Sequence, residues 1–240
     1  MPIGDARFLL IFVTVLMTQL SISALNDWAD RAADAQAHRF RPVAMGRIGA
    51  PLALALAIVF ALGALPGALA YGLAGIFVLL GLVAGWTYDL WLKPTPLSFL
   101  PFAVAFPLLP TWVGLVAGRP LPSLAWLFCA GVPLATAIHL ADSLPDVELD
   151  RAAGLRTLAV QLGFQRAARV TVGCLLLGSL VLVVTLLSGP VLAIVVVLTA
   201  VVGSSMLVRV VGSRPQRARW IVASTAIVAV LAWFAGHARG

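Results

Sequence analysis

Long stretches without charged side chains constrain this sequence more than any other feature. Runs free of Asp, Glu, Lys and Arg cover residues 8–26, 48–88, 94–118, 120–141, 170–208 and 220–238. A helix needs about 20 residues to cross the hydrocarbon core of a bilayer, so the 41-residue and 39-residue runs each predict two helices. We expect these runs to break at Pro66-Gly67 and at Ser188-Gly189-Pro190, where Pro and Gly interrupt regular structure. The sequence therefore predicts an all-α integral membrane bundle of about eight transmembrane helices.

Composition excludes an ordinary water-soluble domain. Of the 240 residues, 62% are hydrophobic and only 10% are charged, whereas a typical soluble domain has about 25% charged residues. The mean hydropathy is +1.06. The net charge of +7 does not indicate a nucleic-acid partner, because membrane proteins retain Arg and Lys on their cytoplasmic side. Cys129 and Cys174 lie in apolar runs and suggest neither a disulfide framework nor a zinc site.

The basic residues predict the orientation of the bundle. If the eight spans alternate, 13 of the 16 Lys and Arg residues lie in loops on one side. That side is then cytoplasmic, and both termini lie outside. The N-terminal run has neither a basic leader nor a convincing cleavage site, so we interpret it as a retained helix rather than a signal peptide. We expect a multi-pass protein of the cell membrane, specifically a bacterial inner membrane.

Eight of the nine acidic residues fall on the predicted cytoplasmic side, and seven of them form two clusters. Both clusters place polar residues at i, i+4 and i+8, which lie on one face of a helix. These positions are Asn26, Asp30 and Asp34 in the first cluster and Asp142, Asp146 and Asp150 in the second. Corresponding positions are 116 residues apart, which indicates a duplicated unit. We expect one domain, 1–240, with related halves of about 6–118 and 119–240.

The spacing of the acidic side chains suggests a metal. Like charges four residues apart on a helix repel one another unless a cation lies among them. Carboxylates without a His or Cys cluster favour a hard ion such as Mg²⁺, whose shell is often completed by phosphate oxygens. Two facing motifs are suited to hold two such ions on one diphosphate. Solvated helix caps are the simpler interpretation of a single cluster, but they do not explain two matched clusters.

At full length, the two motifs resemble the signatures of the UbiA superfamily of intramembrane prenyltransferases. The first is Asn26-Asp27-x-x-Asp30-x-x-x-Asp34, followed by Arg41-Pro42-x-x-x-Gly46-Arg47-Ile48. The second is Asp146-x-x-x-Asp150-Arg151-x-x-Gly154-x-x-Thr157-Leu158-Ala159-Val160-x-x-Gly163. Between them, Tyr88 and Lys93 stand where family members often carry a Tyr and a Lys. The resemblance extends from about residue 8 to the end of the chain.

The resemblance implies Mg²⁺-dependent transfer of a prenyl chain from a polyprenyl diphosphate donor to a small hydrophobic acceptor, usually an aromatic ring. It assigns one ion to Asn26, Asp30 and Asp34 and the other to Asp146 and Asp150, with Asp27 and Asp142 as auxiliary ligands. Asp30, Asp34, Asp146 and Asp150 are the residues expected to be essential for catalysis. The candidates for gripping the donor are Asn26, Arg39, Arg41, Arg47, Tyr88, Lys93 and Arg156, although the basic ones also serve as topology signals.

The sequence departs from the family pattern in two places. The family usually has nine spans and carries its first acidic motif after the second of them. Here the motif follows the first span, which implies either a misplaced start or an eight-helix variant. Relatives also often place an Asp and a basic residue where this chain has Ser143-Leu144-Pro145. That change casts doubt on the second metal site.

Several side chains near the cytoplasmic helix ends have two interpretations. Trp28, Trp86, Tyr88 and Trp91 can stabilise an allylic cation, but Trp and Tyr also gather at membrane interfaces. His139 lies three residues before Asp142. It can act on the acceptor or hydrogen-bond across helices, and we favour the packing role.

Three other functions compete with prenyl transfer. A transporter built from repeats carries ionisable residues or broken helices deep in its spans, and only His139 comes near that description. Another membrane transferase acting on diphosphate-linked lipids would also use Asp-rich motifs, and a non-catalytic relative would keep them as remnants. The acceptor, the donor chain length and the oligomeric state leave no trace in the sequence. The Arg41–Ile48 and Thr157–Val160 segments favour the prenyltransferase.

Overall fold

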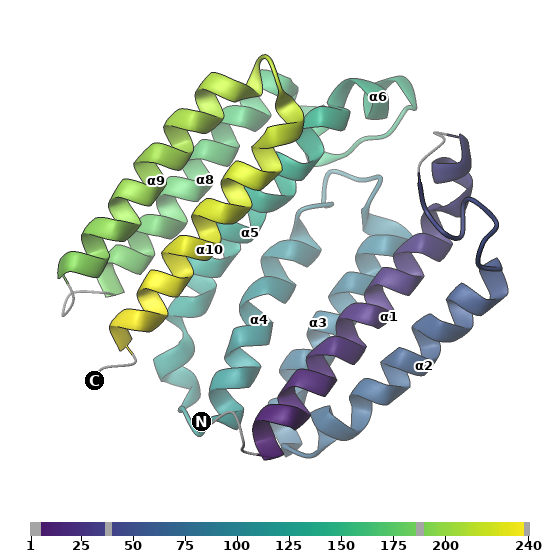
Figure 1. Cartoon of the computed structure of the whole chain (residues 1–240), viewed down its shortest axis with the longest axis horizontal. Coiled ribbons are helices and arrows are strands. Elements are labelled where there is room, and N and C mark those ends of the chain that lie inside the picture. The colour runs from purple at the N-terminus through teal and green to yellow at the C-terminus, as the bar shows by residue number, and fades with distance from the viewer. Residues whose placement is uncertain (1–5, 37–39, 186–189, 238–240) are drawn as a thin grey trace. The chain divides into compact units, whose positions relative to one another are not determined.

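The computed structural model describes residues 6–36, 40–185 and 190–237, and these residues form helices and connecting turns without a strand (Figure 1). The long helices are α1 (Ala6–Gln36), α2 (Ala50–Leu69), α3 (Gly75–Thr87), α4 (Leu100–Val116), α5 (Trp126–Ser143), α8 (Phe164–Thr185), α9 (Pro190–Val211) and α10 (Ala218–His237). The short ones are η1 (Gly72–Ala74), η2 (Tyr88–Leu92), η3 (Leu121–Leu124), η4 (Leu144–Asp146), α6 (Val147–Ala152), α7 (Leu158–Leu162) and η5 (Pro215–Arg217). The all-α prediction is confirmed.

Each of the eight predicted spans contains one of these long helices. By length and composition, six helical stretches in the described residues can cross a membrane: Ala6–Gln36, Ala50–Leu69, Gly72–Leu92, Leu121–Ala152, Phe164–Thr185 and Val191–Val211. Leu100–Val116 is apolar but shorter. The chain is therefore a multi-pass membrane protein, whereas the count of eight crossings and the side on which the termini lie stay predictions.

The chain forms two compact units. One contains the described residues up to Lys93 together with Leu108–Leu124, and the other contains Pro94–Pro107 and the chain from Ala125 onward. The division into related halves is not tested by these units and stays a prediction.

In the first unit, α1 lies against α2 and α3 (Figure 1). A Cβ atom on Gly67 would lie 1.7 Å from Thr14 Oγ1, so only glycine lets α2 approach α1 this closely. Small residues at such contacts are typical of helices that pack in a membrane. Trp112 of α4 is completely buried against Ala68 and Val78.

The expected break at Pro66-Gly67 is wrong by several residues. Pro66 lies inside α2, which continues to Leu69, and the turn into η1 uses Gly72 with φ of +54°. Proline removes one backbone donor, but membrane helices tolerate it because neighbouring groups satisfy the freed carbonyl. The other expected break lies outside the described residues at 188–189, between the end of α8 at Thr185 and the start of α9 at Pro190.

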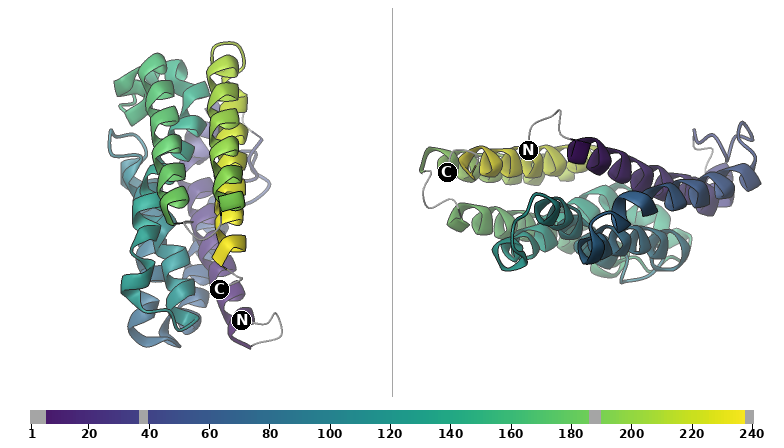
Figure 2. Two further views of the ribbon diagram at one scale, coloured as in Figure 1. Left: turned by 90° about the vertical axis from the view of Figure 1, so that its left-hand side faces the viewer. Right: turned by 90° about the horizontal axis from the view of Figure 1, so that it is seen from below.

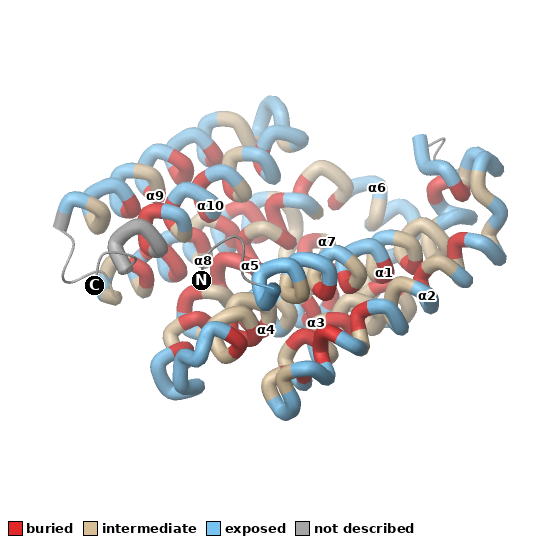
Figure 3. The backbone as a smooth tube through the Cα atoms, turned by 60° about the horizontal axis from the view of Figure 1, so that its bottom comes forward, coloured by how far each residue is buried: buried red, intermediate tan, exposed pale blue. Residues whose placement is uncertain are grey.

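In the second unit, α5, α8, α9 and α10 pack side by side, and Figure 2 shows the pairing of α9 with α10 from two further directions. The rings of Trp126 and Trp233 lie 3.8 Å apart, and Trp233 Nε1 donates to Thr185 Oγ1 at 2.7 Å. Most of α5 between Pro133 and Ala141 is buried, whereas buried and exposed positions alternate along α8 and α9 (Figure 3). On α9, Ile194, Leu198 and Val201 are all more than half exposed. Large apolar side chains exposed on one helical face suit contact with lipid.

Candidate active site

The first acidic motif lies on one unbroken helix. Asn26, Asp30 and Asp34 all belong to α1, which runs to Gln36. Four-residue spacing on an α-helix places these side chains on one face, as the sequence predicts. Asp34 is buried, with 4% of its surface exposed.

The residues opposite this face come from η2, a π-helical turn that extends α3. Lys93 N donates to Tyr88 O at 3.0 Å, a bond between residues five apart. Asp89 Oδ1 accepts a 2.9 Å hydrogen bond from Asn26 Nδ2. The Lys93 ammonium forms an ion pair with the Asp30 carboxylate. A π-helical turn is rare and frequently marks a functional site.

These contacts belong to a series with constant register. Asn26 meets Asp89 and Asp30 meets Lys93, and both partners are 63 residues apart in the chain. Ile22 and Gly85, which have the same separation, are also in contact, since a Cβ atom on Gly85 would lie 2.5 Å from Ile22 Cδ1. A constant offset means that α1 runs parallel to α3 and η2. The three contacts follow one another at four-residue intervals along α1. They run from the apolar contact of Ile22 with Gly85 to the polar pairs formed by Asn26 and Asp30.

The remaining predicted residues of this unit gather near the same end. Arg41 Nη1 lies 3.4 Å from Asp27 Oδ1. The Tyr88 ring lies 5.7 Å from Lys93 Nζ, and the Arg47 guanidinium lies 5.8 Å from the Phe40 ring. The structure therefore places these residues in three sets of contacts along α1: Asn26 with Asp89, Asp27 with Arg41, and Asp30 with Lys93 and Tyr88. Arg39 lies outside the described residues.

The second acidic motif, in the other unit, does not form one continuous α-helix, and this expectation is wrong. Asp142 ends α5, Asp146 closes the 3₁₀ turn η4 and Asp150 lies in α6. Pro145 lies in that turn. Because proline has no N–H, an α-helix cannot pass through it without losing a bond. Asp142 is largely exposed and lies 3.6 Å from Arg219, whereas Glu148 accepts two bonds from Arg151.

The residues after the second motif form a short capped helix. Thr157 Oγ1 accepts a bond from Val160 N at the start of α7, and Gly163 ends that helix with φ of +70°. Gly154, with φ of +76°, also adopts a conformation that favours glycine. Arg156 has an exposed side chain, and its backbone N donates to Pro94 O at 3.0 Å. The structure thus explains the Gly-x-x-Thr part of this motif by backbone conformation and capping.

His139 takes part in packing within this unit. Its Nε2 lies 3.0 Å from the buried Ser98 Oγ, and its ring lies 4.7 Å from that of Phe102. Ser98 Oγ also accepts a 3.4 Å bond from Leu158 N. These contacts fit the interhelical role that we favour for His139. Trp86 likewise donates to Ser21 Oγ at 3.0 Å.

The chemistry of the first motif fits a hard divalent cation. Amide and carboxylate oxygens are the ligands that Mg²⁺ prefers, and Asp89 Oδ2 is buried without a hydrogen-bond partner in the described part of the chain. Across those same residues, no three His, Cys, Asp or Glu side chains converge closely enough to hold a metal. Asp27 and Asp30 are each paired with a cationic side chain instead.

Asp89 is the residue that the sequence hypothesis did not include. It lies four residues before Lys93, the same spacing that relates Asn26 to Asp30. Paired spacing on two segments is a signal that could have identified it, since side chains four apart share a helical face.

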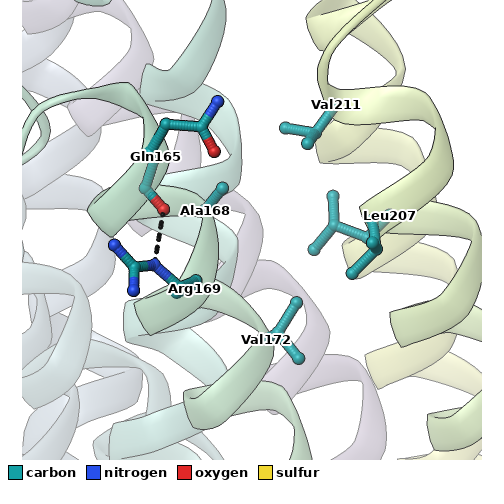
Figure 4. A pocket seen from close by; sticks show the side chains of 7 residues that line it. Gln165, Ala168, Arg169, Val172, Leu207 and Val211 are labelled. Atoms are coloured by element: carbon teal, nitrogen blue, oxygen red, sulfur yellow. Dashed lines mark hydrogen bonds between the residues drawn. The ribbon is translucent and has the colours of Figure 1, made fainter.

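A separate pocket of about 210 Å³ lies between α8 and α9 (Figure 4). Val172, Leu207, Val208 and Val211 line it, with Ala168, Gln165 and Arg169 completing the wall. Arg169 Nε donates to Gln165 O at 3.4 Å. The pocket contains none of the predicted site residues and no carboxylate, so it is not the candidate active site.

Comparisons with known proteins agree with the motifs. The model of the UbiA prenyltransferase family matches residues 2–228. The digeranylgeranylglyceryl phosphate synthase of Korarchaeum cryptofilum (strain OPF8) is 27% identical over 167 residues, which cover 68% of this chain and 58% of that relative. The chain thus spans less than two thirds of the relative's length.

Solved structures share the fold. A UbiA homolog from Aeropyrum pernix K1 superposes with a TM-score of 0.81 at 16% identity, covering 98% of this chain and 90% of the other. A UbiA homolog from Archaeoglobus fulgidus bound to GPP and Mg²⁺ gives 0.79 at 18% identity, covering 97% and 87%. At these identities the likeness concerns the fold alone.

Proposed function

The chain belongs to the UbiA prenyltransferase family, and from this membership we propose that it transfers a prenyl group from an allylic prenyl diphosphate to a small hydrophobic acceptor in a Mg²⁺-dependent reaction. The observation that supports this proposal most is the polar end of α1, where Asp30 pairs with Lys93 and Asn26 pairs with Asp89. This arrangement combines hard oxygen ligands with a cation that can bind phosphate.

The first acidic motif would hold one ion through Asn26, Asp30 and Asp34, and the second would hold another through Asp146 and Asp150. Asp27 and Asp142 are auxiliary candidates. Bound Mg²⁺ would neutralise the negative charge that develops on the departing diphosphate. The Archaeoglobus fulgidus homolog bound to DMAPP and Mg²⁺, which resembles this chain with a TM-score of 0.77, supports the choice of metal and of donor class.

Basic side chains supply the rest of the diphosphate site. Lys93 engages a carboxylate of the motif, which supports its ammonium as a candidate to bind the phosphate oxygens. Arg41, beside Asp27, offers a guanidinium that can bind phosphate in a bidentate manner. Arg47, Arg156 and Tyr88 are further candidates for this contact. Charge at fixed positions stabilises the departing group without reorganisation during the reaction.

The reaction breaks the bond between the allylic carbon and the bridging oxygen, and both electrons leave with the diphosphate. The allylic carbon then bonds to the acceptor, which loses a proton. Apolar helices around the site exclude water from the allylic cation. Tyr88, whose ring already lies 5.7 Å from the Lys93 ammonium, presents an aromatic face of the kind that stabilises a cation.

Two acceptor classes are candidates. An aromatic ring is the acceptor that the sequence resemblance favours. A hydroxyl acceptor on a glycerol-phosphate lipid is favoured by the digeranylgeranylglyceryl phosphate synthase of Korarchaeum cryptofilum, which is 27% identical over the matched segment. We place the reaction at the cytoplasmic face of the plasma membrane, where a water-soluble donor headgroup can reach the motifs.

The test is Mg²⁺-dependent binding and turnover of geranylgeranyl diphosphate by the detergent-purified protein. Asp30→Ala and Asp146→Ala should each abolish binding. Glu148→Gln is the matched control, because Glu148 lies within the second motif but is 71% exposed and paired with Arg151. Parallel assays with an aromatic acid and with geranylgeranylglyceryl phosphate separate the two acceptor classes. Binding that is absent, or that ignores both alanine substitutions, would contradict the proposal and favour a non-catalytic family member.

A further inference from the structure

Asp89 is a buried carboxylate, and one of its two oxygens accepts a hydrogen bond. Only 7% of its surface is exposed. Its Oδ1 accepts the 2.9 Å bond from Asn26 Nδ2, while its Oδ2 has no hydrogen-bond partner within the described ranges. Burying a polar atom without a partner is unfavourable for stability. Stability therefore does not explain why a buried carboxylate lies directly beside the first acidic motif.

The bond to Asp89 determines which way the Asn26 amide faces. An asparagine side chain ends in one oxygen and one NH₂ group of nearly the same shape, and only the oxygen can bind a metal ion. A carboxylate oxygen accepts hydrogen bonds, so it attracts the NH₂ group of Asn26 and repels its oxygen. Asn26 Oδ1 is therefore directed away from Asp89.

The contact to Asn26 is made from η2. The bond from Lys93 N to Tyr88 O widens the helical turn to five residues. That turn presents Asp89 to Asn26 and Lys93 to Asp30 at the same time. The two contacts lie on successive turns of α1. Asp89 therefore pairs with the residue one turn before Asp30, a carboxylate that the proposed metal site requires.

We propose that Asp89 is a positioning residue that holds the Asn26 amide with its oxygen free to bind the metal ion. The proposal rests on the proposed function, because it assigns Asn26 to the first ion. Partners that orient metal ligands in this way typically change metal affinity by about 10–100-fold when they are mutated. In this role Asp89 acts on the ion through the orientation of Asn26.

The test measures binding of Mn²⁺, used as a paramagnetic probe, to the detergent-purified full chain in the presence of inorganic diphosphate. Asp89→Asn should lower Mn²⁺ affinity about tenfold, because the new amide can pair with Asn26 in either orientation. The same substitution should have no cost in an Asn26→Asp background, where both terminal atoms at position 26 are oxygens and need no orientation. An equal loss in both backgrounds would mean that Asp89 acts only through its charge, and the proposal would be wrong.

A matched control separates orientation from helix packing. Trp86→Phe removes the 3.0 Å bond from Trp86 Nε1 to Ser21 Oγ, which also joins α3 to α1. It should lower the melting temperature without changing Mn²⁺ affinity. If Asp89→Asn behaves like Trp86→Phe, Asp89 has only a structural role.

Asp30→Ala identifies which hypothesis has failed. If it leaves Mn²⁺ binding intact, the proposed metal site is wrong. If it abolishes binding while Asp89→Asn does not weaken it, only the positioning role of Asp89 is refuted.

Discussion

Gly85→Ala places a methyl group in a close contact between α3 and α1, four residues before Asp89. The added Cβ atom would lie 2.5 Å from Ile22 Cδ1, 2.7 Å from Ile22 Cγ1 and 3.2 Å from Ile22 Cγ2. Carbon atoms in contact are ordinarily about 3.5–4.0 Å apart, so the shortfall at Cγ1 is about 1 Å. Rotation about the Cβ–Cγ1 bond of Ile22 moves Cδ1 and can relieve the first clash. It cannot relieve the other two, because both of those carbons are bonded directly to Cβ.

The two helices must therefore separate locally, and the effect on function should exceed the effect on stability. Overpacking of this kind typically costs about 1–3 kcal/mol. The displaced contact is one turn away from the pair formed by Asn26 and Asp89. A displacement of about 1 Å near reacting groups can lower a rate about 100-fold. We expect Gly85→Ala to remain folded in detergent and to lose most of its Mn²⁺ affinity and prenyl transfer.

Unfolding by titration with SDS measures the stability change, and geranylgeranyl diphosphate turnover measures the functional one. Gly81→Ala is the matched control on the same helix, because a Cβ atom there meets nothing within 4 Å. Ile22→Ala removes all three clashing atoms and should restore activity to Gly85→Ala in the double variant. The reasoning fails if Gly85→Ala and Gly81→Ala are equally stable and equally active.

Two further substitutions test the second unit. Ser98→Ala should lower the free energy of unfolding by about 1–3 kcal/mol, because it removes the 3.0 Å contact with buried His139; an unchanged SDS-unfolding midpoint would show that the contact contributes nothing. Arg219→Gln should change stability by less than about 1 kcal/mol, since its pair with Asp142 is about half exposed on both sides; a larger loss in the same titration would mean that this arginine supports the second motif.

The spans were predictable because the membrane leaves the backbone few choices. With no water in the hydrocarbon core, every backbone polar group must be bonded within its own segment or to a close neighbour. A charge-free run of sufficient length therefore becomes a helix, as at α8 and α9. The i, i+4, i+8 face of α1 follows from the same local geometry.

The pairing of α1 with η2 could not be predicted in this way. Local spacing shows that Asn26 and Asp30 share a face, but it does not show which distant segment lies opposite. That register is set by packing at the close approach of Gly85 to Ile22, and the pairs of Asp89 with Asn26 and of Lys93 with Asp30 follow it. The matching four-residue spacing of Asp89 and Lys93 marks the residues of the second segment, but it does not give the 63-residue offset at which the two segments pair.

Pro66 and Pro145 show that the same residue has opposite effects in two environments. Pro66 lies near the end of α2, and the helix passes through it. Pro145 follows the end of α5, and the chain changes there to a 3₁₀ turn. At a helix end the carbonyl groups already lack helical partners, so leaving the α-helix at Pro145 sacrifices little. Within a membrane span, leaving the helix would expose several polar groups to lipid, so the chain accepts the loss of one bond at Pro66. A rule that proline ends helices therefore holds at Pro145, at the polar end of α5, and fails at Pro66, within α2.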